Sequence, residues 1–340
     1  MGKNVDRLRA NRHEDFRRLL LAMASETRTN EEHVSGYHVR QRVQNALTHT
    51  GNSALWHKIK ACSRSSRCQS LWCGHCRQSA AKAVETQIRK RLIDEEAMLA
   101  GTSLERSSPE FNNHMNTNHR HVSGYVGVFS LDQASVLAGL AFDRNRWKKL
   151  KERKTNRAFW IAGNYEMELV NYRFLMSSMN SESVKKQHQI GQLLSYSHDM
   201  GWISQGDNVG VLLHWHAVTN ATEDDLVDVL GGAYWINNER LFKTSAPGVY
   251  VQNLHQDKLF DVNISKMASY ALKSKSATRY KHSFIGSDVG DELMLQSELA
   301  GLIDLYDQIQ KRNWRALMFT HTVGNGQMPV LSNKEADSSD

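Results

Sequence analysis

The chain has 340 residues, and 43 Lys and Arg against 36 Asp and Glu give it a formal net charge of +7 and a pI of about 9.2. Hydrophobic residues make up 40% and charged residues 23%, a balance that excludes collagen-like, wholly disordered and disulfide-dense chains. No apolar run approaches the length of a membrane span, and the N-terminal segment has neither a secretory h-region nor a myristoylation pattern. We therefore expect a cytoplasmic protein without membrane attachment.

Hydrophobic patterning predicts a helical N-terminal part followed by alternating strands and helices. Helices are expected over 5–48 and near 77–99, and the polar stretch 101–121 is typical of a loop or linker. Further along, we expect strands at 125–133, 159–170, 208–220 and 248–254, and helices at 133–153, 181–199, 224–232, 264–275 and near 290–312. This pattern predicts an α/β or α+β fold with a central sheet, and we favour α+β.

Domain boundaries follow from the same reading. We expect a basic, cysteine-bearing helical module over 1–100, a polar linker over 101–120, a main domain over 121–288, and a C-terminal helix with a polar tail over 289–340.

The positive charge is concentrated in a few segments, of which 144–157 (RNRWKKLKERKTNR) is the densest. Clustered Lys and Arg are typical of proteins that bind a phosphate backbone, although a basic helix face can also be merely solvated. The candidate DNA-binding residues here are Lys148, Lys149, Lys151 and Arg153.

All four cysteines fall within one short window, as Cys62, Cys68, Cys73 and Cys76. In a reducing compartment such clustering favours a metal over disulfides, and the spacing C-x5-C-x4-C-x2-C suits a structural tetrahedral zinc ion. His57 or His75 replacing one cysteine is an alternative, and incidental reduced thiols are another.

Two histidines alternate on a predicted apolar strand, GVLLHWHAV, so His214 and His216 should lie on one face with Trp215 on the other. Neighbouring imidazoles can bind one divalent cation. A second pair, His119 and His121, falls in the polar stretch and illustrates how often this spacing occurs by chance.

Two further patterns could complete a catalytic site. Glu166 and Glu168 share a strand face, and either could add a carboxylate to a His–His site, although a solvent-facing strand edge explains them as well. Tyr270 and Lys273 share a face of a predicted helix, where a lysine would favour phenolate and a phenolate could attack phosphorus. A half-buried helical tyrosine is the plainer alternative.

In this order, the motifs resemble those of the rolling-circle replication initiators of small bacterial plasmids, which belong to the HUH endonuclease superfamily. The resemblance covers about residues 55–285. It rests on CSRSSRCQSLWCGHCR, YVGVFSLDQ, WKKLKERKTNRAFWIAGNYEMELVN, His214-Trp215-His216 and GVYVQNLHQDKLFDVNISKMASYALK.

The resemblance implies an HUH fold, in which helices flank a central, antiparallel-rich sheet, and a DNA-nicking activity. Tyr270 would attack a phosphate of single-stranded or extruded plasmid origin DNA, form a 5′-phosphotyrosine and leave a 3′-hydroxyl primer, before the strands are rejoined. His214, His216 and a glutamate, with Glu168 favoured slightly over Glu166, would hold Mg²⁺ or Mn²⁺, and Lys273 would assist. The sequence departs from the family at Lys266, where an acid is often found.

The family also implies partners: a host helicase and polymerase, with a homodimer through the C-terminal helix as an option. Two readings compete with the initiator. A single-strand transposase or relaxase of the same superfamily would use the same chemistry on another substrate. A zinc-module DNA-binding regulator would bind DNA without cleaving it.

Overall fold

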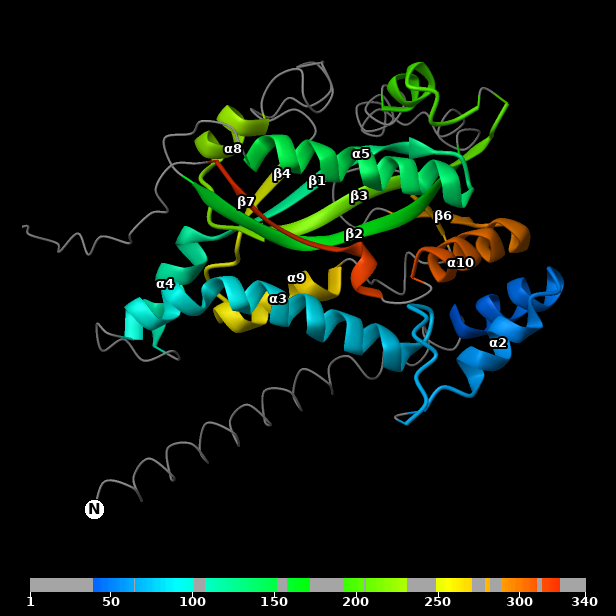
Figure 1. The fold of residues 1–340 in the computed structure, drawn as a ribbon. Coiled ribbons are helices and arrows are strands. Elements are labelled where there is room, and N and C mark those ends of the chain that lie inside the picture. The colour runs from blue at the N-terminus through cyan, green and yellow to red at the C-terminus, as the bar shows by residue number, and fades with distance from the viewer. Residues whose placement is uncertain are drawn as a thin grey trace, which may run out of the picture.

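The computed structural model describes residues 39–63, 65–100, 108–151, 158–171, 193–204, 206–230, 249–270, 279–281, 289–310 and 314–324 (Figure 1). A five-stranded sheet forms its centre, with the strand order β4-β1-β3-β2-β7. All four neighbouring pairs are antiparallel. The strands are β1 (Arg120–Phe129), β2 (Phe159–Asn171), β3 (Val209–Thr219), β4 (Val249–Asn253) and β7 (Met318–Val323). The expected α+β fold with a central antiparallel sheet is confirmed.

Helices cover both faces of this sheet. Figure 1 shows α5 and α8 on one face and α3, α4 and α9 on the other. Their bounds are α2 (Ser53–Lys60), α3 (Gly74–Ala100), α4 (Pro109–Asn118), α5 (Gln133–Lys151), α8 (Glu223–Leu230), α9 (Phe260–Tyr270) and α10 (Gln296–Gln310). Shorter or unlabelled elements are helices over 39–49 and 193–199, the 3₁₀ turn Trp314–Leu317, and the hairpin of β5 (Arg279–Lys281) with β6 (Val289–Leu293).

Strand alternation distributes the sheet's side chains between two cores. On the α5 face, Trp215 packs edge-on against Trp147 of α5 at 5.7 Å between ring centroids. The buried carboxylate of Asp143 on α5 fixes this helix to the sheet, because it accepts a hydrogen bond from the hydroxyl of Tyr165 on β2 at 2.7 Å. It also accepts one from the Trp147 indole at 3.0 Å and forms an ion pair with Arg146. Full burial of Asp143 raises the pKa of its carboxyl group, against the attraction of Arg146.

On the opposite face, one end of the sheet packs on α3, α4 and α9. Trp160, Ala162 and Val218 of the sheet form one cluster with Ile264 and Ala268 of α9. Because side chains two residues apart share a strand face, His216 lies on the same face as Val218. This helix layer therefore ends next to the histidine pair.

A β-bulge changes the phase of β1. Tyr125 pairs with His214 and Gly127 pairs with Leu213, so Val126 is an extra residue. Tyr125 and Val128 consequently both pack on the His214 face, where they belong to one small cluster with Leu212.

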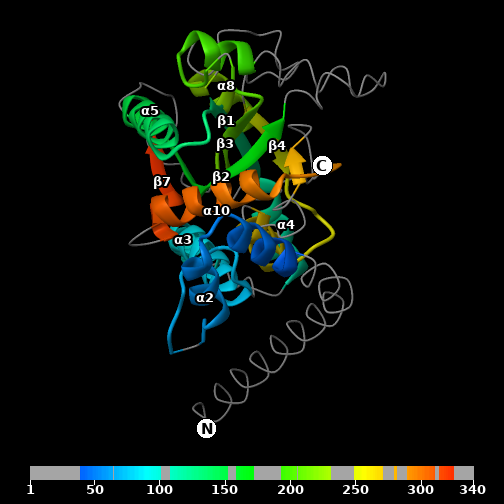
Figure 2. The same ribbon diagram turned by 90° about the vertical axis from the view of Figure 1, so that its right-hand side faces the viewer.

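The N-terminal helices pack on the main domain beside α10 (Figure 2). Val43, Leu47, Leu55 and Trp56 share one hydrophobic core with the buried face of α10 and with three of the cysteines. Among the described residues, none of the helices combines the length and hydrophobicity that a bilayer crossing requires.

Most expected elements are present, with shifted ends. The strands near 159–170, 208–220 and 248–254 and the helices near 77–99 and 133–153 are confirmed. The expected elements over 1–38 and 172–192 lie outside the described residues, as do the ends of the helices predicted to reach 232 and 275.

Three local predictions are wrong. The stretch 101–121 is not a loop throughout, because 109–118 form α4. Ser108 caps this helix by accepting a hydrogen bond from the Phe111 N–H at 3.1 Å, and Pro109 follows it at the first helical position. β1 begins at Arg120, five residues before the predicted strand, and residues 289–293 form β6 rather than the start of a helix.

Candidate metal centres

The central strand presents the histidine pair to the sheet face that α9 also covers. His214 is 1% exposed, and its ring stacks on the buried ring of Tyr125 at 5.7 Å. The neighbouring strand β2 runs antiparallel to β3, with Glu166 directly opposite His214. Gly163 permits this close pairing, because a Cβ atom there would lie 2.1 Å from the His216 carbonyl oxygen. Two adjacent strands thus bring imidazoles and carboxylates together.

Glu166 lies between the two imidazoles. Its Oε2 is 3.5 Å from His214 Nε2 and 3.2 Å from His216 Nε2. One ligand atom from each of Glu166, His214 and His216 lies within 4.8 Å of the other two. Such a His–His–carboxylate set could hold a divalent metal and leave coordination positions open for substrate oxygens.

Glu168 shares the face but stands to one side of this triad. Its Oε2 is 3.0 Å from His214 Nε2, and its exposed fraction, 7%, equals that of Glu166. The closer approach to both histidines makes Glu166 the better candidate for the carboxylate ligand. Glu168 could then hold His214 or serve as a fourth ligand.

The donor set fits a divalent cation. Two buried carboxylates repel each other and are costly to desolvate, and a divalent ion offsets both effects. Both ring nitrogens of His214 are buried, and Nε2 faces the carboxylates of Glu166 and Glu168. An imidazole nitrogen in that condition is suited to coordination.

A third histidine, His121, lies beside His216, although the sequence pattern did not predict it there. His121 Nε2 is 3.2 Å from His216 Nδ1, and Ser123 Oγ is 2.7 Å from the same atom. The wrong start of β1 placed His121 in a loop. The available signal was the alternation of His121, Ser123 and Tyr125, which continues the strand towards its N-terminus.

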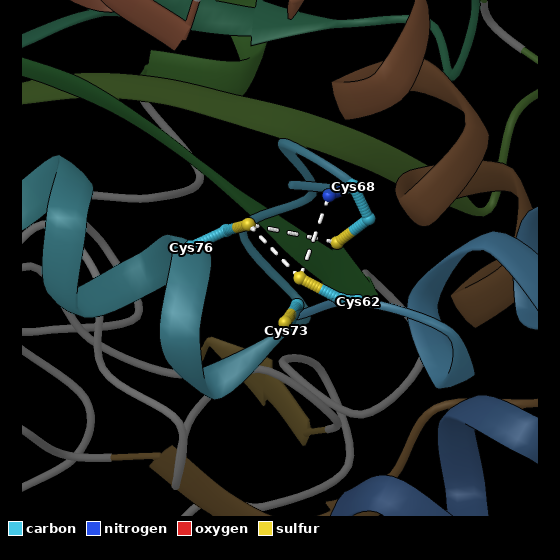
Figure 3. Close-up of side chains that lie close together, drawn as sticks. All are labelled: Cys62, Cys68, Cys73 and Cys76. Atoms are coloured by element: carbon cyan, nitrogen blue, oxygen red, sulfur yellow. Dashed lines mark hydrogen bonds between the residues drawn. The ribbon is translucent and has the colours of Figure 1, made fainter. Parts of the chain in front are cut away.

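The four cysteines form a separate cluster at the N-terminus of α3 (Figure 3). The Sγ atom of Cys76 is 3.6 Å from those of Cys62 and Cys68, and all four sulfurs lie within 4.8 Å of one another. A tetrahedral zinc ion with Zn–S bonds of about 2.3 Å requires sulfurs about 3.8 Å apart. The cluster therefore has the size of a structural zinc site, and no disulfide joins these cysteines.

The surroundings of Cys73 favour its thiolate form. Hydrogen bonding with Cys68 and with the backbone N–H groups of Cys76 and His75 lowers the pKa of Cys73 to about 4. The hydrogen bond with Cys73 and burial raise the pKa of Cys68. His57 and His75 are both exposed, so four thiolates remain the ligand set that the geometry favours over an imidazole.

A short chain of contacts joins the two centres. Trp72, next to Cys73, packs edge-on against Tyr306 of α10 with ring centroids 6.2 Å apart. The Tyr306 hydroxyl in turn bonds to the backbone of Met167, which stands between Glu166 and Glu168 on β2.

The remaining candidate residues are placed only in part. Tyr270 is the last residue of α9, and its side chain is outside the described set, as are Lys273 and Arg153. Lys266 is half-buried on α9. The other three candidate DNA-binding residues, Lys148, Lys149 and Lys151, are exposed on α5, across the sheet from the histidine face.

Comparison of the chain with protein-family models, with curated proteins and with solved structures found no match to any of them.

Proposed function

We propose that the protein is a metal-dependent DNA-nicking and strand-transfer enzyme with an HUH fold, acting as a rolling-circle replication initiator. The observation that carries this proposal is the convergence of Glu166, His214 and His216 on one buried sheet face. The four-cysteine cluster ahead of that domain, in the order expected from the resemblance, adds support.

The position of α9 supports Tyr270 as the nucleophile. Ile264 and Ala268 attach this helix to Val218, which is two residues beyond His216 on the same strand face. The helix that ends at Tyr270 therefore packs beside the proposed metal centre rather than on the α5 face.

The reaction would proceed as an exchange of phosphodiester bonds. The Tyr270 phenolate oxygen forms a bond to phosphorus, the bond from phosphorus to the 3′-oxygen breaks, and that oxygen takes up a proton to become a free 3′-hydroxyl. Lys273 would favour the phenolate form. A divalent cation held by Glu166, His214 and His216 would polarise the phosphate and offset its developing charge. Attack by a 3′-hydroxyl on the phosphotyrosine reverses the exchange and rejoins the strand.

The exposed lysines of α5 have a different role in this proposal. Since α5 covers the far face of the sheet, Lys148, Lys149 and Lys151 would contact phosphates of DNA flanking the nick site rather than the scissile phosphate. Neutralising them should weaken DNA binding and reduce its salt dependence without changing the cleavage position.

The test is covalent capture of DNA. The protein is incubated with Mn²⁺ and overlapping single-stranded pieces of both strands of the DNA that encodes it, and the products are run on a denaturing gel. Wild type should give a slowly migrating adduct, and so should the control Tyr280→Phe, which removes a tyrosine of β5 ten residues beyond Tyr270. Tyr270→Phe, His216→Ala and Glu166→Gln should give none while still binding DNA.

Other outcomes point elsewhere. DNA binding without an adduct in wild type would contradict the nickase and favour a zinc-module regulator, for which the cysteine cluster is the supporting observation. An adduct that persists in Tyr270→Phe would refute the nucleophile assignment. Cleavage at the ends of a mobile element rather than at a replication origin would favour a transposase.

A further inference from the structure

A line of hydrogen-bonding groups crosses three strands and ends at His216. Gln252 Oε1 lies 3.1 Å from His121 Nδ1, and His121 Nε2 lies 3.3 Å from Ser123 Oγ. Ser123 Oγ lies 2.7 Å from His216 Nδ1. Each step links side chains close together on one face of the sheet.

The sheet register holds this line in place. His121 of β1 is directly opposite Gln252 of β4, and Ser123 of β1 is directly opposite His216 of β3. Side chains of directly opposed residues are close neighbours on a sheet face. Ser123 and His121 are also buried, at 4% and 6% exposure, so their partners are fixed by the fold.

The chemistry of the groups gives the line a direction. An amide oxygen can only accept, so His121 must carry its proton on Nδ1 and offer a lone pair at Nε2. Ser123 then donates its hydroxyl proton to His121 Nε2 and accepts from His216 Nδ1–H. The direct contact of 3.2 Å between the two histidines fits this assignment, with His216 Nδ1–H as the donor and His121 Nε2 as the acceptor.

The consequence falls on the other nitrogen of His216. A neutral imidazole with its proton on Nδ1 has a lone pair on Nε2. His216 Nε2 is the atom that lies 3.2 Å from Glu166 Oε2, on the side of the ring facing the carboxylate and His214. A ligand to a divalent cation needs that lone pair.

We propose that Gln252, His121 and Ser123 are positioning residues that hold His216 in the Nδ1–H tautomer and aim its Nε2 lone pair at the metal centre. This inference rests on the metal centre used in the proposed function, but not on DNA cleavage.

The first test reads the tautomer directly in metal-free protein. The chain is labelled with ¹⁵N-histidine, and long-range ¹H–¹⁵N correlation spectra are recorded at neutral pH, with His216 assigned through His216→Asn. Wild type should show His216 protonated at Nδ1. Ser123→Ala removes the shorter contact and leaves only the direct contact with His121, so it should weaken that preference. Gln252→Leu, at an exposed position, should weaken it as well. Gln252→Glu, which keeps an acceptor oxygen, should retain it.

The second test measures the affinity for Mn²⁺ alone, from the electron paramagnetic resonance signal of the free ion. Loss of an outer partner of a ligating histidine weakens metal binding by about 10- to 100-fold, so Ser123→Ala should fall in that range. Gln252→Leu should lose less, and Gln252→Glu should stay within about twofold of wild type. Asn253→Ala, next to Gln252 on the same exposed strand, is the matched control and should bind as wild type does.

The outcomes separate the two proposals. Wild-type His216 protonated at Nε2, or an unchanged tautomer and affinity in both Ser123→Ala and Gln252→Leu, would overturn the positioning role. An Nδ1–H tautomer in a protein that does not bind Mn²⁺ would support the hydrogen-bonded line and contradict the metal centre. Because Gln252 is exposed, its variants test the proposal even if Ser123→Ala folds poorly.

Discussion

The Tyr306 hydroxyl binds both backbone groups of Met167: it accepts a hydrogen bond from the Met167 N–H at 2.8 Å and donates one to the Met167 carbonyl at 2.9 Å. The pairing of β2 with β7 runs from Phe159 to Asn164, so Met167 lies beyond the end of that ladder. Tyr306 thus continues the bonding of the β2 edge where the neighbouring strand stops. The residues on either side of Met167 are the two candidate carboxylate ligands.

Removing the Tyr306 hydroxyl should lower both the stability of the fold and the Mn²⁺ affinity of the metal centre. Tyr306→Phe leaves a buried N–H and a buried C=O without their partner, which costs about 1–3 kcal/mol of folding free energy. It also frees the backbone that carries Glu166 and Glu168, so we expect weaker Mn²⁺ binding. Chemical denaturation and Mn²⁺ titration of the folded variant measure the two effects.

Tyr196→Phe is the matched control, since Tyr196 is half-buried and packs on Trp202 in the segment 193–204. It should leave Mn²⁺ affinity unchanged. Equal Mn²⁺ affinity in Tyr306→Phe and wild type would show that the Tyr306 contact is structural alone.

Zinc removal should destabilise the N-terminal module. We expect one zinc ion per chain by elemental analysis, lost in Cys73→Ser and retained in His75→Ser, because His75 is exposed. Since Cys68, Cys73 and Cys76 belong to the main hydrophobic core, chelation should also lower the thermal midpoint of the whole protein. Zinc retained at full occupancy in Cys73→Ser would contradict the four-thiolate assignment.

A half-buried histidine on β7 should make stability depend on pH. His321 stacks on the rings of both Trp147 and Phe319, and burial, followed by the charges of Arg144 and Arg91, lowers its pKa to about 4. In the unfolded chain the pKa is about 6.5, so the unfolded state binds a proton that the folded state does not. Folding free energy from this group is therefore complete above pH 6.5 and is lost as the pH falls towards 4, by at most about 3 kcal/mol.

His321→Phe keeps the ring stacking and removes the titrating group. Urea unfolding at several pH values between 4 and 7 should show a shallower loss of stability in this variant than in wild type. His57→Phe replaces an exposed histidine of α2 and should keep the wild-type dependence. The same slope in wild type and His321→Phe would refute the contribution.

The strands of the sheet, and the faces on which their histidines and glutamates lie, could be predicted because both depend on local sequence patterns. The alternation in GVLLHWHAV predicts the face shared by His214 and His216, and the same rule predicts that Glu166 and Glu168 share one. Which carboxylate approaches both histidines depends on the register of β2 against β3, and a single strand contains no information about its register with another.

The missed features have two physical causes. The polar composition of 109–118 favours a loop, whereas the capping signal Ser108-Pro109 indicates the start of a helix. The capping signal is the correct one, because α4 begins there. The spacing of His119 and His121 does not reveal the role of His121, because that role depends on β3 and β4, which are distant from β1 in sequence and adjacent to it in space. Side-chain positions that arise from strand pairing need the fold before they can be recognised.

At the extra residue Val126, the alternation of side chains along β1 shifts by one position. On its N-terminal side the odd-numbered residues His121, Ser123 and Tyr125 face the metal centre, and beyond it the even-numbered Val128 does. Deleting Val126 would leave Tyr125 opposite His214 and Gly127 opposite Leu213, so both halves of the strand would keep their present faces. The bulge is therefore a point where β1 can lose one residue without moving the hydrogen-bonding half of the strand.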